Sequence, residues 1–300
     1  MEATVDSVIR TRGLAKSYRG RAALQGIDLD VPRNVVFGYL GPNGAGKTTT
    51  IRLLAGLLRP TAGTAEILGS DSVRDRERAQ RHIGYLPGEF VAYPDLTGAQ
   101  YLRFIGNLRG GMDWSVAEDI AKRLDLDLTA RVGTLSHGNK QKVGIVQAFM
   151  HQPEVLILDE PTTGLDPLAQ REFLGLIREA RDQGHTVFLS SHILYEVEAV
   201  ADMVGILRRG RLIVVETVDR LKARALRRID LTFEGQPPLA ALRAVPSVRE
   251  ASASGTTANL VVEGSTADLL EVAAPHRVAQ VVTHEPDLEE IFMSYYGQGG

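Results

Sequence analysis

One eight-residue segment constrains the fold of this chain more than any other. Residues 41–48 read GPNGAGKT, which satisfies the pattern G-x-x-x-x-G-K-[ST]. The uncharged apolar run Val35–Leu40 precedes the segment, and the amphipathic stretch Thr49–Leu58 follows it. A buried strand, a glycine-rich turn and a helix, in this order, form a setting in which backbone N–H groups bind phosphate. The segment therefore predicts an α/β fold built around a phosphate-binding loop.

The residue types in this loop predict that it binds ATP together with Mg²⁺. Its glycines let N–H groups turn inward, and the following helix directs the positive end of its dipole at the phosphates. Lys47 would bridge the β- and γ-phosphates, and the Thr48 hydroxyl would coordinate Mg²⁺. A turn that merely caps a helix would need neither residue at this offset. The predicted nucleotide-binding residues of the loop are Gly41, Pro42, Asn43, Gly44, Ala45, Gly46, Lys47, Thr48 and Thr49.

An acidic pair, Asp159 and Glu160, follows the apolar run Val155–Leu158. A carboxylate at the C-terminal end of a buried strand emerges at the rim of the sheet, where ligands bind in open α/β folds. Asp159 would hold Mg²⁺, and Glu160 would orient and deprotonate a water in line with the γ-phosphate. An acidic helix start ahead of Pro161 would give the same pattern. Paired with residues 41–48, the two acids instead predict a nucleotide-hydrolysing site.

The chain from about Ile9 to Ile213 alternates short apolar runs with amphipathic stretches, which is typical of a largely parallel sheet flanked by helices. The two apolar runs already named and Thr186–Leu189 are predicted to be its buried central strands. The more loosely alternating stretch Ile9–Val31 is predicted to form antiparallel strands on the edge of this sheet. From about residue 87 to 152 helical periodicity replaces the strand pattern, which predicts a helical insertion.

The character of the sequence changes after Glu216. A basic helical segment, Val218–Arg228, leads into elements in the predicted order β-α-β-β-α-β, and a closing helix, Pro286–Tyr296, follows them. The predicted strands are Arg228–Phe233, Val248–Ala253, Ala258–Glu263 and Val278–Thr283, and the predicted helices between them are Pro238–Ala244 and Thr266–Ala274. The predicted domains are residues 1–216 and 217–300. The fold class is thus α/β: a phosphate-loop NTPase core with an antiparallel edge sheet and a helical insertion, followed by a small C-terminal α+β domain.

The composition limits where the chain acts and what it binds. A net charge of −3 and a pI near 6.2 give no basic surface, so no nucleic-acid partner is expected. The absence of cysteine excludes disulfides and suits a reducing compartment. Met1–Arg10 shows no secretory signal, and the apolar runs are too short to span a bilayer. We therefore expect a soluble chain whose membrane role, if it has one, comes through a partner.

Three further motifs follow the loop in order. Residues 135–141 read LSHGNKQ, residues 159–167 read DEPTTGLDP, and Ser190-Ser191-His192 comes after the third apolar run. Together with residues 41–48, their order and spacing resemble the nucleotide-binding domain of ABC transporters. The resemblance covers roughly Ile9 to Val215 and is specific, because four ordered motifs coincide.

The resemblance implies roles for residues outside the loop. Ser136, placed as a helix N-cap, together with Gly138 and Asn139 would form the family signature, which faces the γ-phosphate held by a second copy of the domain. Asp166 would lie in the loop that communicates between the two sites. His192 would contact the γ-phosphate and help to hold the attacking water. The catalytic residues implied in this way are Lys47, Glu160 and His192.

Tyr18 matches the aromatic residue on which adenine stacks in this family. A lone tyrosine is otherwise more often a core residue, so the order of the motifs carries this assignment. The signature departs from the family's Gly-Gly-Gln, because it reads His137-Gly138-Asn139 and its amide is one methylene shorter.

A second departure concerns the residue after Ile83–Pro87. The family places a glutamine there, which touches Mg²⁺ and senses the membrane partner, whereas this chain has Gly88 followed by Glu89. We hypothesise that Glu89 takes over part of that role as a ligand of Mg²⁺, since carboxylates bind this ion well. The alternative is that Glu89 is a solvated acid in a coupling loop.

The resemblance implies an ATPase subunit that powers a membrane transporter from the cytoplasmic face of the cell membrane. Its expected partners are transmembrane permease subunits and a second nucleotide-binding subunit, either another copy or a paralogue. Both departures, and the closing segment Pro286–Phe292, resemble drug- and antibiotic-export members of the family. An importer subunit, a soluble ABC protein acting on ribosomes or chromosomes, and a non-hydrolysing sensor are the alternatives. The intact Asp159, Glu160 and His192 argue against the sensor.

Overall fold

The computed structural model describes residues 7–224, 226–284 and 288–297. The chain divides into two compact units, Met1–Val215 and Glu216–Gly300, and each is considered by itself. None of the helices within the described residues combines the length and the apolarity that crossing a bilayer requires.

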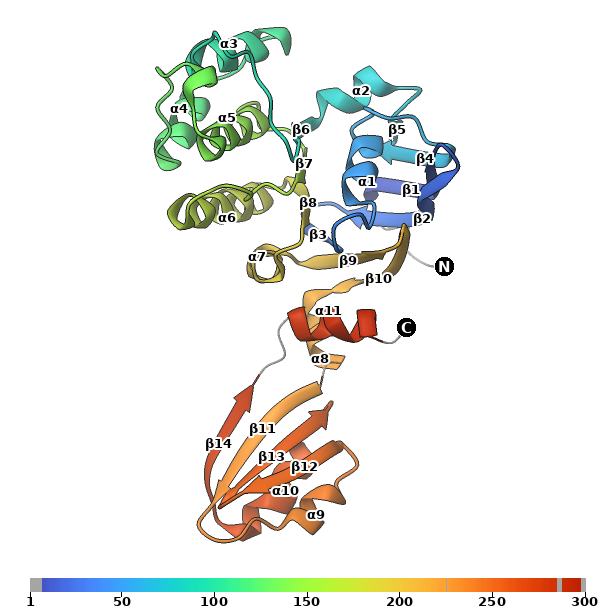
Figure 1. The fold of residues 1–300 in the computed structure, drawn as a ribbon, viewed down its shortest axis with the longest axis vertical. Helices are drawn as coiled ribbons and strands as arrows, with labels where there is room; N and C mark the ends of the chain where they lie inside the picture. The colour runs from blue at the N-terminus through green and yellow to red at the C-terminus, as the bar shows by residue number, and fades with distance from the viewer. Residues whose placement is uncertain (1–6, 225, 285–287, 298–300) are drawn as a thin grey trace. The chain divides into compact units, whose positions relative to one another are not determined.

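The first unit is organised around a six-stranded sheet with the strand order β10-β9-β3-β8-β7-β6 (Figure 1). Its strands are β3 (Val36–Leu40), β6 (Ile83–Leu86), β7 (Val155–Asp159), β8 (Thr186–Ser191), β9 (Met203–Arg208) and β10 (Arg211–Thr217). The pairs β6–β7, β7–β8, β8–β3 and β3–β9 are parallel. Every residue of β3, β7 and β8 is buried, which explains why these strands read as uncharged runs. The three predicted central strands are confirmed.

Helices cover both faces of this sheet (Figure 1). Helix α1 (Lys47–Leu54) contacts β7 and lies on the face toward the N-terminal strands. The opposite face is covered by α6 (Pro167–Asp182) and α7 (Leu194–Val200). A short helix, α2 (Arg76–Arg81), precedes β6. The first turn of α1 therefore sits directly after the C-terminal end of β3, at the sheet edge where the C-terminal ends of β7 and β8 also lie.

The N-terminal strands are antiparallel, as predicted, but they belong to a separate sheet. Its order is β2-β1-β4-β5, with β1 (Ser7–Tyr18), β2 (Arg21–Pro32), β4 (Ala62–Ile67) and β5 (Ser70–Asp71). The apolar face of β1 and β2 packs in one cluster with side chains of β3 and α1. The sheet therefore stacks over α1 through its apolar face and does not extend the hydrogen-bonded edge of the parallel sheet.

Helices fill the segment predicted as an insertion. They are α3 (Gly98–Leu108), α4 (Trp114–Arg123), the 3₁₀ turn η1 (Val132–Thr134) and α5 (His137–Phe149). A capping box begins α3, because the Thr97 hydroxyl accepts from the Gln100 amide while the Gln100 side chain accepts from the Thr97 amide. The pair Gly110-Gly111 separates α3 from α4.

The second unit has the predicted order β-α-β-β-α-β. Its elements are α8 (Val218–Arg224), β11 (Leu226–Phe233), α9 (Leu239–Arg243), β12 (Val248–Ser254), β13 (Thr257–Glu263), α10 (Ala267–Ala273), η2 (Ala274–His276), β14 (Val278–His284) and α11 (Leu288–Gly297). The sheet order is β12-β13-β11-β14, and every pair is antiparallel. Ile229, Leu231 and Phe233 of β11 pack with Leu242 and Leu269 in a core of its own. Of the predicted closing helix, residues 286 and 287 lie outside the described residues.

A glycine in β6 offers a test of how tightly the first unit is packed. A Cβ atom at Gly84 would collide with the carbonyl oxygen of Ala148 and with the side chains of Pro153 and Leu156. We expect Gly84→Ala to lower the free energy of unfolding by about 1–3 kcal/mol, because overpacking forces the backbone to move. Urea unfolding followed by the fluorescence of Trp114 measures this, since Trp114 is the one tryptophan of the chain and lies in the first unit.

The matched control is Gly175→Ala in α6. A Cβ atom there meets only the Arg123 guanidinium, at 3.6 Å, and alanine in a helix is favoured over glycine by about 0.5–1 kcal/mol. This variant should therefore be as stable as the wild type or slightly more so. Equal unfolding curves for the two variants would contradict the packing described for Gly84.

Candidate active site

A cavity of about 420 Å³ opens at the C-terminal ends of β3 and β7, beside the start of α1. Ligands of open α/β sheets bind at this edge. The cavity is lined by Ala23, Pro42, Asn43, Gly44, Gly46, Lys47, Thr48, Thr49, Gly88, Asp159, Glu160, Thr163 and His192. Most of the loop residues predicted to bind nucleotide therefore lie together with both predicted acids and His192.

The loop has a shape that side chains would prevent. A Cβ atom at Gly41 would lie 2.6 Å from the carbonyl oxygen of Leu207. Gly46 adopts φ 114°, a region that favours glycine, and its Cβ atom would lie 2.7 Å from Leu24. The backbone therefore passes close to β9 and β2 before α1 begins at Lys47. The first amide groups of α1 face the cavity without a side-chain cap.

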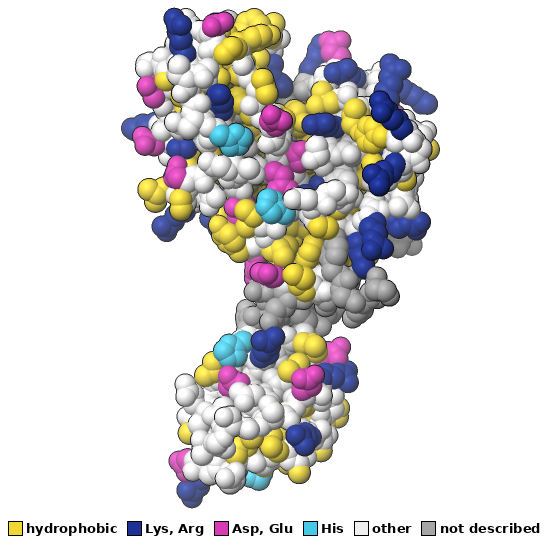
Figure 2. Space-filling view, in the orientation of Figure 1, with side chains coloured by type: hydrophobic (Ala, Val, Ile, Leu, Met, Phe, Trp, Pro, Cys, Tyr) yellow, Lys and Arg dark blue, Asp and Glu magenta, His cyan; other side chains and the backbone are white. Residues whose placement is uncertain are grey.

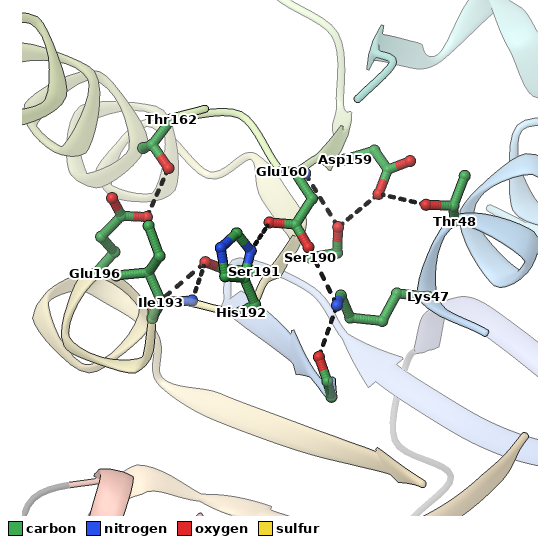
Figure 3. A network of polar contacts seen from close by, with 11 residues as sticks. Lys47, Thr48, Asp159, Glu160, Thr162, Ser190, Ser191, His192, Ile193 and Glu196 are labelled. Carbon is green, nitrogen blue, oxygen red and sulfur yellow. Dashed lines mark hydrogen bonds and ion pairs between the residues drawn. The ribbon is translucent and has the colours of Figure 1, made fainter. Parts of the chain in front are cut away.

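Lys47 is buried, with 6% of its side chain exposed, and its ammonium group has two partners. The Nζ atom donates to the carbonyl oxygen of Gly41 at 2.6 Å and lies 3.1 Å from Oε1 of Glu160 (Figure 3). Both partners are oxygen atoms, which satisfy the hydrogen bonds of a buried ammonium group. Lys47 is therefore held where an anionic ligand would compete with Glu160 for it.

Strand pairing brings the first acid to the loop. Asp159 at the end of β7 lies beside Ser190 of β8 in the parallel ladder, and the Ser190 hydroxyl donates to Oδ1 of Asp159 at 2.7 Å. The Thr48 hydroxyl donates to the same oxygen at 3.3 Å (Figure 3). Asp159 is 1% exposed, so these two hydroxyl groups stabilise a carboxylate that water scarcely reaches.

The second acid is turned into the cavity by an unusual backbone conformation. Glu160 adopts φ 49°, which is uncommon for a residue with a side chain. Its amide donates to Oγ and to the carbonyl oxygen of Ser190, at 3.1 and 3.2 Å. Its Oε2 atom lies 2.5 Å from Nδ1 of His192, which is half exposed (Figure 3). Lys47, Glu160 and His192 thus form a continuous polar chain across the cavity.

The signature residues do not line this cavity. The hydroxyl of Ser136 accepts from the amide of Asn139 at 3.3 Å and caps α5, as its position in the sequence predicts. A Cβ atom at Gly138 would collide with the carbonyl oxygen of Gly164, so the backbone at the start of α5 closely approaches the turn that follows Glu160. The Gln141 side chain of α5 also donates to the carbonyl oxygen of Pro161 in this turn, at 3.1 Å. Ser136 itself is exposed.

Asp166 also lies outside the cavity, where it caps α6. Its Oδ1 atom accepts from the amides of Leu168 and Ala169, and its Oδ2 atom lies 3.3 Å from the ammonium group of Lys142 in α5. The hydrogen bond from Ala169 and the nearby Lys142 hold the pKa of Asp166 below its ordinary value. The residue therefore links α5 to α6 through an ion pair.

Two other predicted residues lie away from the cavity lining. Tyr18 is 45% exposed, and the Lys16 ammonium group lies 5.3 Å from the centre of its ring. Glu89 is exposed, whereas its neighbour Gly88 lines the cavity with its backbone. A side chain at position 88 would have room, because a Cβ atom there meets Asp159 at an ordinary 3.4 Å. The structure therefore does not bring Glu89 to Thr48 and Asp159.

Sequence reasoning assigned no role to Ser190, which bonds to both acids. The sequence feature that could have indicated Ser190 is its position at the end of the third apolar run, which places it at the same sheet edge as Asp159. Ala23 and Thr163, which complete the lining, gave no signal that distinguishes them from ordinary loop or strand residues.

The parallel sheet, the glycine-rich loop and the buried Lys47 beside two acids define a phosphate-loop NTPase. A profile of the ABC transporter family matches residues 24–163. The bacitracin transport ATP-binding protein BcrA of Bacillus licheniformis is 36% identical over 235 residues, which cover 77% of this chain and 77% of BcrA.

The linearmycin resistance ATP-binding protein LnrL of Bacillus subtilis (strain 168) is 31% identical over an aligned length of 307 residues, which covers 97% of this chain and 99% of LnrL. A solved structure of the ATP binding subunit of an ABC transporter, 32% identical, superposes with a TM-score of 0.67 over 72% of this chain and 92% of that chain. The chain therefore belongs to the ATP-binding proteins of the ABC transporter family. It is an ATPase, and the ATP that it hydrolyses powers transport.

The exposure of Tyr18 allows its stacking role to be separated from a packing role. We expect Tyr18→Ala to weaken ATP binding by about 1–3 kcal/mol, the range for a base stacked on an aromatic ring. Its effect on the free energy of unfolding should be small, because the ring is 45% exposed. Titration with a fluorescent ATP analogue measures the first quantity and urea unfolding the second. An unchanged affinity would favour a packing role.

The position of Glu89 predicts the result of removing it. Because its side chain is exposed and absent from the cavity lining, we expect Glu89→Ala to leave the Mg²⁺ dependence of ATP hydrolysis unchanged. Thr48→Val is the matched comparison and should raise the Mg²⁺ concentration needed for half-maximal rate, because the Thr48 hydroxyl lies beside Asp159. A higher Mg²⁺ requirement in Glu89→Ala would instead support Glu89 as a ligand.

Proposed function

We propose that the chain is the ATP-hydrolysing subunit of an exporter of drugs or antibiotics. The observation that carries this proposal is the similarity to two proteins named for bacitracin transport and for linearmycin resistance, which the chain covers over 77% and 99% of their lengths. Within the chain, residues 1–216 would form the ATP-binding domain, with its helical insertion at about 87–152, and residues 217–300 an accessory domain. The nucleotide would occupy the cavity beside the start of α1.

The polar chain across that cavity suggests how hydrolysis proceeds. Lys47 is paired with Glu160 at 3.1 Å, and a γ-phosphate would draw the ammonium group to itself because it carries more negative charge. Glu160 would then be free to accept a proton from the attacking water, with His192 beside it holding that water and the phosphate. The amides at the start of α1 would bind the phosphate oxygens.

The residues around Asp159 fit a magnesium ion. Mg²⁺ prefers hard oxygen ligands and is commonly held by one or two protein groups together with phosphate oxygens and water. Asp159 and the Thr48 hydroxyl, 3.3 Å apart, supply two such oxygens at the cavity wall. When bound, the ion would neutralise charge on the β- and γ-phosphates.

The position of the signature favours a second nucleotide-binding subunit. Ser136, Gly138 and Asn139 begin α5, a helix of 13 residues, but none of them lines the cavity of its own chain. The exposed start of such a helix attracts phosphate through its amides and dipole. We infer that it serves the nucleotide of a partner subunit, another copy of this chain or a paralogue, with Asp166 close to the contact.

An apolar surface on the helical insertion fits a permease partner. Hydrophobic side chains gather over α3 (Figure 2), and those that are exposed in this region include Val91 (78%), Tyr93 (57%), Phe104 (42%) and Leu108 (69%). The rings of Tyr93 and Phe104 pack edge to face at 5.8 Å, so they form one surface. Contiguous exposed apolar side chains mark sites of protein contact. Through this surface the subunit would be held at the cytoplasmic face of the cell membrane.

One variant tests both the chemistry and the transport. Glu160→Gln keeps the size of the side chain but removes the base, so we expect hydrolysis to fall by about 10²-fold or more while ATP still binds. Hydrolysis is measured by phosphate release, binding by equilibrium titration, and export by the resistance of cells that carry the whole transporter to a panel of peptide and polyketide antibiotics. Resistance should be lost in Glu160→Gln cells.

The control is Glu172→Gln, which alters a half-exposed carboxylate of α6. It should leave hydrolysis, binding and resistance at wild-type levels. Wild-type hydrolysis in Glu160→Gln would refute Glu160 as the base. If the wild type itself conferred resistance to none of the antibiotics, export of these compounds would be refuted while the ATPase remained.

A further inference from the structure

A third carboxyl group lies beside the catalytic pair without touching the cavity. Glu196 is in α7, one helical turn after His192, and is 2% exposed. Its Oε2 atom accepts a hydrogen bond from the Thr162 hydroxyl at 2.7 Å (Figure 3). Its Oε1 atom is buried and has no hydrogen-bond partner among the described residues. Such a group is expensive to bury, so its place needs a physical reason.

Glu196 connects the turn that follows Glu160 to the helix that follows His192. Thr162 is two residues after Glu160, in the turn where the Thr163 amide donates to the Glu160 carbonyl oxygen. Glu196 itself lies in α7 (Leu194–Val200), which begins two residues after His192. The hydrogen bond between Thr162 and Glu196 therefore joins the turn after β7 to the helix after β8 (Figure 3).

The charges around Glu196 bear on which form of the carboxyl group is present. Burial is the main cause that raises its pKa, and the negative Glu160 adds to the rise, while the Thr162 hydroxyl and His192 act in the opposite direction. A second full negative charge here would compete with Glu160 for His192. A neutral Glu196 makes the same hydrogen bond to Thr162 without this competition.

We propose that Glu196 is a positioning residue, which ties the turn at Thr162 to α7 and thereby keeps His192, just before that helix, in contact with Glu160. This inference rests on the proposed roles of Glu160 and His192 in hydrolysis. The contact at stake is the 2.5 Å approach of His192 Nδ1 to Glu160 Oε2, which α7 alone does not fix because the His192 side chain is 49% exposed. Without the link, α7 would lose its hydrogen bond to the turn at Thr162.

The test compares four variants of the full-length chain. Glu196→Ala removes the link, Thr162→Val removes its other end at constant size, and Glu196→Gln keeps a side chain that accepts the same hydrogen bond. Val197→Ala is the matched control, because Val197 is the fully buried neighbour in α7 and makes no polar link. For each variant the kcat and KM for ATP, the melting temperature and the NMR signals of the His192 imidazole are measured.

We expect Glu196→Ala and Thr162→Val to lower kcat by about tenfold or more, because small misplacements of reacting groups cost this much, with KM changed less than twofold. Their combination should be no worse than either alone, since both break one link. Glu196→Gln should restore kcat to within about twofold of the wild type on the same reasoning. Val197→Ala should lower the melting temperature but leave kcat near the wild-type value. The imidazole signals of His192 should move toward those of a free histidine only in the first two variants.

Three kinetic results would overturn the proposal: an unchanged kcat in Glu196→Ala, a loss of kcat in Glu196→Gln as large as in Glu196→Ala, or an equal loss of kcat in Val197→Ala. The NMR signals of His192 test the link independently of the rate of ATP hydrolysis. If Glu160→Gln hydrolysed ATP normally, the proposed role of Glu160 as the base would fail, yet a His192 signal that shifts in Glu196→Ala and not in Val197→Ala would still establish the link. An unchanged His192 signal in Glu196→Ala would refute it.

Discussion

The rest of the site depends on the two hydrogen bonds that the Ser190 hydroxyl group makes. It donates to Asp159 and accepts from the amide of Glu160, so one side chain of β8 fixes both acids at the end of β7. The parallel ladder places Ser190 beside Asp159, and the buried strands on either side give it no freedom to move. The positive φ of Glu160 persists because its amide is held in this way. The register between β7 and β8 therefore determines where the two acids of the cavity lie.

Much of the core could be predicted from the sequence because its signals are local. The loop at residues 41–48 needs its glycines and its Lys-Thr pair in one short segment, and strands buried on both faces show as uncharged runs. The separate N-terminal sheet was not foreseen, because β1 pairs with β4, which lies some fifty residues further along the chain. The sequence also did not predict that Gly88 and not Glu89 lines the cavity, because only the fold decides which of two neighbouring residues faces it. Nothing in the sequence indicates that Glu196 is buried, because it resembles any other polar residue of a helix.

The two units of the chain divide its physical tasks. The core of the second unit is an apolar cluster of its own, built from β11, β13 and the helices α9 and α10. Lys47, Asp159, Glu160 and His192, by contrast, all belong to the first unit. The alignment with LnrL spans nearly the whole chain, whereas the alignment with BcrA spans 77% of it. The geometry of the cavity is therefore set by packing within the first unit, whatever the second unit contributes.

The contact between Gly138 and Gly164 has a mechanical consequence. There the two backbones approach closely, and the Gln141 side chain of α5 also donates to the carbonyl oxygen of Pro161 in the same turn. A shift of the turn after Glu160 therefore passes into the start of α5 with little slack, and the Lys142–Asp166 ion pair follows the same path. In a paired assembly, the loss of a phosphate in one subunit would then displace the start of α5 that faces the nucleotide of the other subunit. The two nucleotide sites would therefore be mechanically coupled and would not act independently.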